Sequence, residues 1–376
     1  MSNYYYSSSQ SSMFLQAETD FGMKMLRQTS INETCVVSPV SVILALATIQ
    51  IGAKGQTKSQ ISRAISNGAT DTEITKYYSH LSEEIVHHKK GTATTIANAF
   101  FMDKKFAMRK SYGSALIKRF KTKVKSFRFQ GTQTISESVD SYVSRKTYGR
   151  IKHIHYPSSI KDALSLLVSV ASFASKWEYS FMKSLNTHGT FYVRESFQRK
   201  VEYMNVVREN RYYAEDEHMQ VLSLRYSDTS YALNIFLPKQ RFALEALRTR
   251  LTGSVIQTTL SQLKSTYMTI SIPKIRVKTE LKLKRVLRAL GVSEVFSDHC
   301  DLSGITKTSA FKISHAAHKA IIEISEGGTT KEENGNYYKP VIEPTPTYEP
   351  TAFIADHPFL FVLTKDYNPL FIGQYV

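Results

Sequence analysis

Residues 353–363 read Phe-Ile-Ala-Asp-His-Pro-Phe-Leu-Phe-Val-Leu, and the run Phe359–Leu363 predicts a strand near the carboxyl end of the chain. The preceding segment, 326–351, is rich in Gly, Thr, Asn, Glu, Tyr and Pro. Its prolines are Pro340, Pro344, Pro346 and Pro350. Because proline cannot donate to a sheet ladder, we expect this segment to be an exposed, extended loop. Strand-forming residues follow it, so the chain must return to the core, and a long loop of this kind is usually functional or disordered.

Upstream of the loop, the apolar pattern changes repeatedly between helical and strand periodicity. Helices are predicted at 13–27, 40–51, 61–65, 74–86, 111–120, 139–147 and 281–290. Strands are predicted at 94–102, 124–129, 164–173, 221–224, 232–237, 268–272 and 318–324. The long apolar run 164–173 is typical of a strand that is buried on both faces. No repeat or charge block divides the chain, so one large mixed domain is allowed.

The composition is that of a globular protein with a strongly basic surface. Of its 376 residues, 49 are Lys or Arg and 32 are Asp or Glu, which gives a net charge of +17. Such an excess predicts a surface that attracts polyanions; the alternative is that the charge only keeps the protein soluble. The two cysteines, Cys35 and Cys300, cannot form a disulfide framework and fit a reducing compartment.

The amino terminus, 1–17, has no basic start, apolar centre or small-residue cleavage site. We therefore expect a cytoplasmic or nucleocytoplasmic protein, with extracellular release by a leaderless route as the alternative. The longest apolar stretches, 36–51 and 163–174, are too short or too interrupted to span a bilayer, so we expect no membrane partner.

Motifs for catalysis and cofactor binding do not occur at usable spacing. There is no G-x-S-x-G elbow, and residues 52–57 have the wrong spacing for a phosphate loop. His315 and His318 lie three apart but have no Cys or carboxylate companions, which makes a metal site a weak expectation. We expect no catalytic residue, no metal and no cofactor.

The residues 353–363 match the signature of one family at every position, and other motifs of that family occur in order along the chain. They are 37–41, 52–57, 97–101, 147–151, 175–177, 237–239, 272–274, 301–304 and 368–373. The sequence therefore resembles the serpins, the serine protease inhibitors, from Phe14 to Val376. Through residues 355–361 it is similar to nematode intracellular serpins.

The resemblance implies one α+β domain over residues 1–376, with three β-sheets, about nine helices and a reactive-centre loop at 326–353. We expect residues 1–12 to be disordered and the protein to be a monomer. An inhibitory serpin lets a serine or cysteine protease cleave the loop, which then inserts into the main sheet as a new strand and distorts the acyl-linked protease.

The hinge of this loop begins as an inhibitor's would. Glu326, Gly327, Gly328, Thr329 and Thr330 combine a flexible glycine pair with a threonine small enough to enter the sheet first. The next residues are Lys331, Glu332, Glu333 and Asn334, where inhibitory serpins carry small residues.

Insertion would turn alternate side chains inward, so Lys331 and Glu333 would follow Thr329 into the core face. Burying those charges costs several kcal/mol each, which their mutual attraction only partly offsets. We therefore predict a weak inhibitor or a non-inhibitor. The alternative is an active suicide-substrate inhibitor in which the two charges pair or reach solvent.

Family spacing places the reactive bond at Ile342-Glu343. Tyr337-Tyr338 and Tyr338-Lys339 are alternatives for a chymotrypsin-like protease, whereas Pro340 blocks the bond that precedes it.

Two further sites are implied by the resemblance. A network that controls sheet opening involves Ser38, Ser41 and His318, with Ser169 where the family has Asn. A hydroxyl has fewer donors than an amide, so we expect this network to be rewired or water-filled. At the site where a strand enters the main sheet, Trp177, Lys274 and Glu326 match the family, and we predict Lys274 and Glu326 within salt-bridge distance.

A basic segment is a candidate polyanion site. Its central residues are Lys118, Arg119, Lys121, Lys123 and Lys125. The alternative is a basic face that only water covers.

Overall fold

The structure is a computed structural model that describes residues 8–86, 92–120, 124–127, 132–154, 163–308, 310–329 and 348–376. Its helices are α1 (Ser8–Arg27), α2 (Pro39–Gly52), α3 (Gly55–Ser66), α4 (Asp71–Val86), α5 (Lys110–Phe120), α6 (Thr132–Lys146), α7 (Leu244–Arg250), α8 (Gly253–Ser261) and α9 (Leu283–Ala289). Its strands are β1 (Cys35–Val37), β2 (Thr92–Asp103), β3 (Lys125–Phe127), β4 (Ser165–Lys176), β5 (Thr187–Arg194), β6 (Phe197–Glu215), β7 (Met219–Arg225), β8 (Tyr231–Pro238), β9 (Lys264–Pro273), β10 (Ile275–Leu281), β11 (His315–Ile324), β12 (Gly328–Thr329), β13 (Thr351–Ile354), β14 (Phe359–Lys365) and β15 (Asn368–Tyr375).

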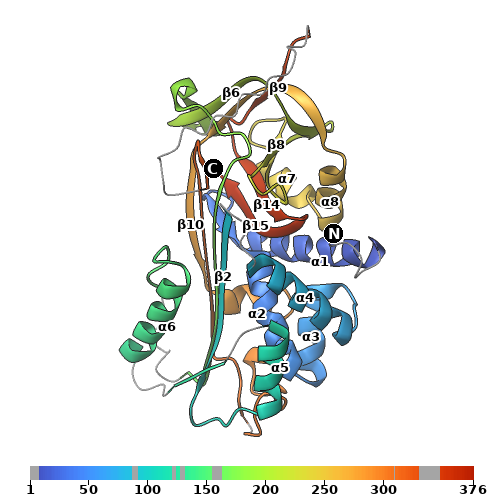
Figure 1. The fold of residues 1–376 in the computed structure, drawn as a ribbon, viewed down its shortest axis with the longest axis vertical. Helices are drawn as coiled ribbons and strands as arrows, with labels where there is room; N and C mark the ends of the chain where they lie inside the picture. The colour runs from blue at the N-terminus through green and yellow to red at the C-terminus, as the bar shows by residue number, and fades with distance from the viewer. Residues whose placement is uncertain are drawn as a thin grey trace.

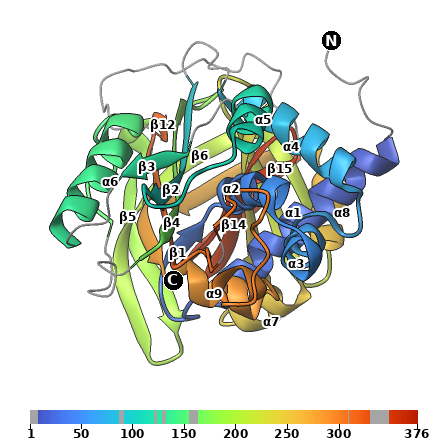
Figure 2. The same cartoon turned by 90° about the horizontal axis from the view of Figure 1, so that it is seen from below.

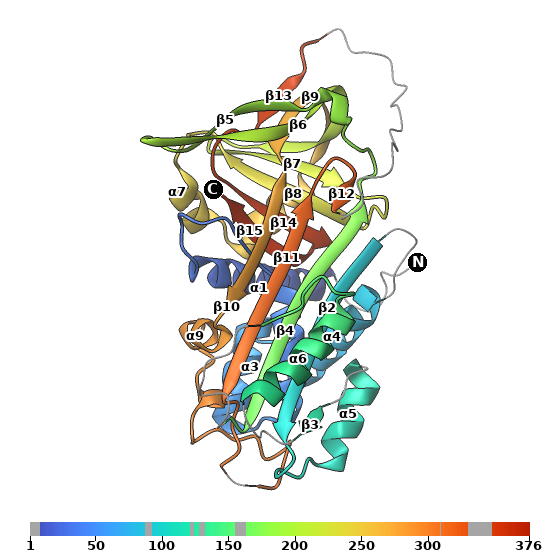
Figure 3. The same ribbon diagram turned by 90° about the vertical axis from the view of Figure 1, so that its left-hand side faces the viewer.

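The six-stranded sheet forms the long side of the molecule. Its order is β10-β11-β4-β2-β3, and β12 pairs with β4 off this path (Figure 3). The central pair, β11 and β4, is parallel, whereas β4 and β2 are antiparallel. Helix α6 lies on one side of this sheet and α2 on the other, as Figures 1 and 2 show from two directions.

The alternation of side chains along β4 produces these two covered faces. Leu167, Ala171 and Phe173 belong to the main core on the α2 side. Leu166, Val168 and Val170 pack instead in a smaller cluster with Ile135, Val139 and Val143 of α6. Because every residue of β4 except Lys176 is buried, the strand has the near-continuous apolar sequence that predicted it.

The second sheet has nine strands and lies beside the upper part of the first. Its path is β1-β15-β14-β8-β7-β6-β9-β13, with β5 paired to β6. The resemblance implies three sheets, and hydrogen bonding joins the described strands into two. The reason is β6, which pairs with β5 over residues 197–203, with β9 over 203–213 and with β7 over 212–215.

Most predicted elements are present, with nine α-helices in the described part of the chain. Residues 8–12, which we expected to be disordered, form the start of α1, and residues 1–7 lie outside the described residues. Leu281, predicted to begin a helix, instead ends β10. Among the described residues, no helix combines the length and apolar character needed to cross a membrane.

Candidate functional site

The candidate site is the place where β11 and β4 part. The two strands pair in parallel from His315 opposite Leu166 to Ile321 opposite Ser172. Above this level the chain turns at residues 325–328, and β12 returns to pair with the end of β4, with Thr329 opposite Ser175. The first hinge residues therefore already form a short strand at the top of the opening between β11 and β4.

The turn into this short strand depends on one glycine. Gly328 has a φ of +129°, and a Cβ built there would lie 2.2 Å from the carbonyl oxygen of Ser175. Gly327 has no atom within 4 Å of its Cβ position. Of the two positions in the predicted glycine pair, only position 328 thus requires a glycine.

Thr329 is held by an aromatic pair beneath it. The residue is buried, and its hydroxyl lies 2.8 Å from the hydroxyl of Tyr226. Tyr226 stacks on Trp177 with ring centroids 4.4 Å apart, and the indole Nε1 donates to the carbonyl of Ser325 at 2.8 Å. Burial raises the pKa of Tyr226 well above its ordinary value, so its hydroxyl remains protonated. The structure thus places the predicted Trp177 at the hinge and adds Tyr226, which no sequence motif identified.

The predicted pair of Lys274 and Glu326 is confirmed, with Nζ and Oε1 2.7 Å apart. Lys274 also contacts Glu202 at 2.9 Å, and the side-chain amide of Asn186 donates to both carboxylates. Burial opposes the charge of Lys274, but hydrogen bonds to Glu326 and Glu202 outweigh it and raise the pKa of the ammonium. One lysine and one amide therefore hold two carboxylates beside the turn.

The four residues predicted to control sheet opening lie together, and an amide from another strand joins them. Ser41 Oγ lies 2.8 Å from Ser169 Oγ, which lies 3.2 Å from His318 Nδ1. The backbone N–H of Ser38 donates to His318 Nε2 at 3.0 Å. The missing asparagine function comes from Asn98 on β2, whose Nδ2 donates to the Ser41 carbonyl at 2.7 Å and whose Oδ1 accepts from Ser41 Oγ.

The network fixes the protonation of His318. Its Nε2 accepts a hydrogen bond, so Nδ1 carries the proton and faces the hydroxyl and carbonyl oxygens of Ser169. Burial lowers the pKa of His318 to about 4, and the carbonyl of Ser169 opposes this only in part. The imidazole is therefore neutral at physiological pH.

Below Thr329, the free edge of β4 is occupied by a side chain from another segment. Arg150, which follows α6, donates from Nη1 to the carbonyl of Phe173 at 3.2 Å. That carbonyl lies on the β4 edge that a strand extending β12 would use.

The remaining predicted residues are separated from this site or lie outside it. Lys118 and Arg119 are in the last turn of α5, and Lys125 begins β3. Lys121, Lys123, Thr330, Lys331, Glu332, Glu333, Asn334, Ile342 and Glu343 lie outside the described residues. No group of three His, Cys, Asp or Glu residues suited to a metal ion occurs in the described part of the chain.

Comparison with known proteins identifies the same family along nearly the whole chain. The family model described as Serpin (serine protease inhibitor) matches residues 16–376. Iripin-2 of Ixodes ricinus is 28% identical over 96% of this chain and 92% of its own length. Serpin I2 of Homo sapiens is 28% identical over 96% of this chain and 90% of its own length.

Solved structures show the same fold at lower sequence identity. Human thyroxine-binding globulin superposes with a TM-score of 0.86 at 22% identity, covering 96% of this chain and 98% of that protein. Uncleaved ovalbumin has a TM-score of 0.85 at 22% identity, covering 96% of this chain and 99% of that protein. These similarities support the fold alone.

Proposed function

The chain belongs to the serpin family, and from that premise we propose that it is a weak inhibitor or a non-inhibitor of proteases whose loop is poorly suited to insert beyond Thr329. Serpins are generally serine protease inhibitors and are generally not enzymes. The observation that carries the proposal is the register of β12 on β4, because it fixes which loop side chains would enter the core.

If that register continued, two charges would lie on the buried face of the sheet. Thr329 lies opposite Ser175, so an extended strand would set Lys331 opposite Phe173 and Glu333 opposite Ala171. Phe173 and Ala171 are buried and face the main core. Desolvating the two charges there costs several kcal/mol each and is only partly offset by their attraction.

The same register brings the loop into competition with Arg150. The backbone N–H of Trp177 donates to the carbonyl of Gly327. In an antiparallel ladder every second pair of opposite residues is hydrogen-bonded, so Phe173 and Lys331 would form such a pair. The N–H of Lys331 would therefore need the Phe173 carbonyl that already accepts from Arg150. Arg150 must move or share that oxygen before the strand can form.

These costs matter because inhibition depends on two competing rates, that of loop insertion and that of acyl-enzyme hydrolysis. Insertion must finish before the acyl-enzyme is hydrolysed, and about 1.4 kcal/mol on the insertion barrier slows it tenfold. A slow loop makes the protein a substrate of the protease that cleaves it.

Incubation with trypsin-, chymotrypsin-, elastase- and cathepsin-type proteases tests the proposal. We expect loop cleavage without a denaturant-stable covalent complex. A variant carrying Lys331→Ala and Glu333→Ala should gain such a complex. Glu332→Ala, which changes a charge on the opposite face of the inserted strand, should not. A covalent complex formed by the unaltered protein would contradict the proposal.

The second candidate is an active suicide-substrate inhibitor of a serine or cysteine protease. It is favoured by β12 itself, because Gly328 and Thr329 already pair with β4 and Thr329 is buried. Peptide mapping of the cleaved loop would test Ile342-Glu343 as the reactive bond for either candidate.

A further inference from the structure

A cavity of about 190 Å³ lies on the α6 side of the six-stranded sheet, where β11 and β4 separate. Five segments contribute polar residues to its lining: Arg150 from the turn after α6, Ser172 from β4, Arg276 and Lys278 from β10, Glu323 from β11, and Thr329 from β12. The cavity is thus built from described residues on both sides of the opening.

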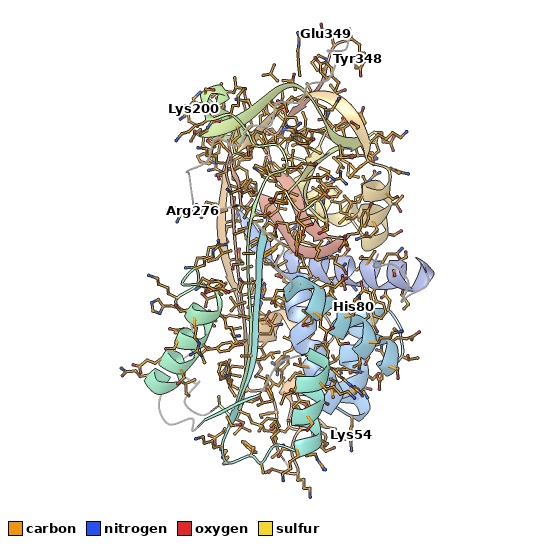
Figure 4. The ribbon with its side chains drawn as sticks, in the orientation of Figure 1. Lys54, His80, Lys200, Arg276, Tyr348 and Glu349 are labelled. Carbon is orange, nitrogen blue, oxygen red and sulfur yellow. The ribbon has the colours of Figure 1, made fainter. Side chains whose placement is uncertain are left out.

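The alternation of β10 directs its charges to this face. Ile275 and Val277 are buried in the main core, whereas Arg276 and Lys278 between and beyond them are exposed. Figure 4 shows Arg276 projecting from β10 on the side of the sheet that carries α6. Three cations and one carboxylate line the cavity, so its charge is positive by two.

Arg150 is the cation best placed to bind a ligand. The turn that carries it is fixed, because its N–H donates to the Thr147 carbonyl at 3.0 Å and the next N–H, of Ile151, donates to Thr147 Oγ1 at 3.1 Å. The guanidinium has five N–H donors in a rigid fork, and one of them reaches Phe173. Burial lowers the pKa of Arg150, and the carboxylate of Glu323 opposes this shift, so the group keeps its charge.

Ser172 lines the same cavity and carries a buried hydroxyl. The residue is 2% exposed, and its Oγ has no hydrogen-bond partner among the described residues. A buried hydroxyl without a partner costs free energy, and an acceptor in the cavity would remove that cost.

We propose that this cavity binds a small tetrahedral oxyanion, a sulfate or a phosphate group. The oxyanion would accept from Ser172 Oγ and from the guanidinium of Arg150, while Arg276 and Lys278 neutralise its charge. A doubly charged anion matches the positive excess of two in the lining. Arginine suits this ligand because its planar donors match the oxygens of sulfate and phosphate.

Binding would stabilise the sheet in its present form. The anion would connect the segment after α6 to β4 and β10, and it would hold Arg150 beside the Phe173 carbonyl. A ligand that binds only this form raises its stability by RT ln(1 + L/Kd), where L is the ligand concentration, so the gain grows with the logarithm of ligand concentration above Kd. The proposal does not depend on whether the chain inhibits proteases.

The test uses the full chain, titrated with sodium sulfate or sodium phosphate against sodium chloride of equal ionic strength. Calorimetry should give saturable binding, and the melting temperature should rise with the logarithm of the anion concentration once that concentration exceeds the calorimetric Kd. Arg150→Gln should weaken binding by about tenfold or more, the loss typical of a hydrogen bond to a charged group, and Arg150→Lys should weaken it less. Arg145→Gln, an exposed arginine at the end of α6, is the matched control and should bind as the unaltered chain does.

If Arg150→Gln fails to fold, Ser172→Ala tests the proposal instead, and its affinity for the anion should fall by about threefold to tenfold. A response that follows ionic strength alone would overturn the proposal, as would unaltered affinity in these variants. A sulfated disaccharide separates the two sources of the anion: binding about tenfold tighter than sulfate assigns the site to a sugar chain, and equal binding assigns it to the free ion. Disaccharide binding that ignores both substitutions lies elsewhere on the surface, and together with sulfate binding that also ignores them it overturns the proposal.

Discussion

Acidification should weaken the sheet-opening network through a single imidazole. His318 is fully buried, and its Nε2 accepts the N–H of Ser38 at 3.0 Å. Protonation would replace that acceptor with a donor and leave a charge in the core, which is why burial lowers the pKa of His318 to about 4. The unfolded chain protonates the same residue near its ordinary value of 6.5.

The difference between these two values gives the size of the effect. A base whose pKa is lower in the folded state stabilises the fold fully above the unfolded value, and this stability is lost as the pH falls from 6.5 toward 4. Each unit corresponds to about 1.4 kcal/mol. Between pH 7.5 and pH 4.5, His318 should therefore remove about 2.5 kcal/mol from the free energy of unfolding.

Urea unfolding followed by the fluorescence of Trp177, the only tryptophan, measures this loss at each pH. His318→Gln should lower stability at pH 7.5 by about 1 kcal/mol, one hydrogen bond, and should lack the additional loss at pH 4.5. His299→Gln, an exposed histidine, should keep it. Other groups titrate in all three proteins, so the comparison isolates His318. Equal pH dependence in His318→Gln and the unaltered chain would refute this explanation.

Three further predictions concern the hinge, the ion pair and the basic surface. Gly328→Ala should shift the fluorescence of Trp177 and expose the hinge to limited proteolysis, because its Cβ collides with Ser175, whereas Gly327→Ala should do neither. Lys274→Ala should cost about 0–1 kcal/mol of stability, as expected for a partly exposed pair. It should also increase loop-sheet polymers seen by size-exclusion chromatography, because we expect the pair of Lys274 and Glu326 to hold the loop out of the sheet; unchanged polymer formation would contradict that role. If the basic segment at Lys118 and Arg119 binds polyanions, heparin should retain the protein beyond physiological salt with a steep salt dependence, and earlier elution would end that hypothesis.

The sequence predicted the elements whose patterns are strong. The apolar run of β4 and the periodicity of α2 follow from burial on every side; the ends of α2 were expected within one residue and those of β4 within three. The long hairpin of β5 and β6 was missed, because its strands are largely exposed or half-buried and carry no sustained apolar alternation. Pairing with β9 stabilises β6, and such long-range pairing leaves little trace in local sequence.

In the candidate site, too, some contacts were predicted from sequence motifs and others depend on tertiary structure. Lys274 and Glu326 were paired correctly from motifs that lie far apart in the chain. Asn98 was within a quoted motif but was not assigned to the network, and only the register of β2, with Asn98 opposite Ser169, reveals its role. Tyr226 and Arg150 reach the hinge from other segments, so their contacts depend on tertiary geometry that periodicity does not encode.

The central claim, that the loop resists insertion beyond Thr329, is tested most directly by the melting temperature before and after clean cleavage of the loop. Complete insertion would add a strand to the six-stranded sheet and raise the melting temperature greatly. The cost of burying Lys331 and Glu333 on insertion and the contact of Arg150 with Phe173 predict a melting temperature that is nearly unchanged by cleavage. A large rise in the cleaved protein would contradict the claim and favour an active inhibitor.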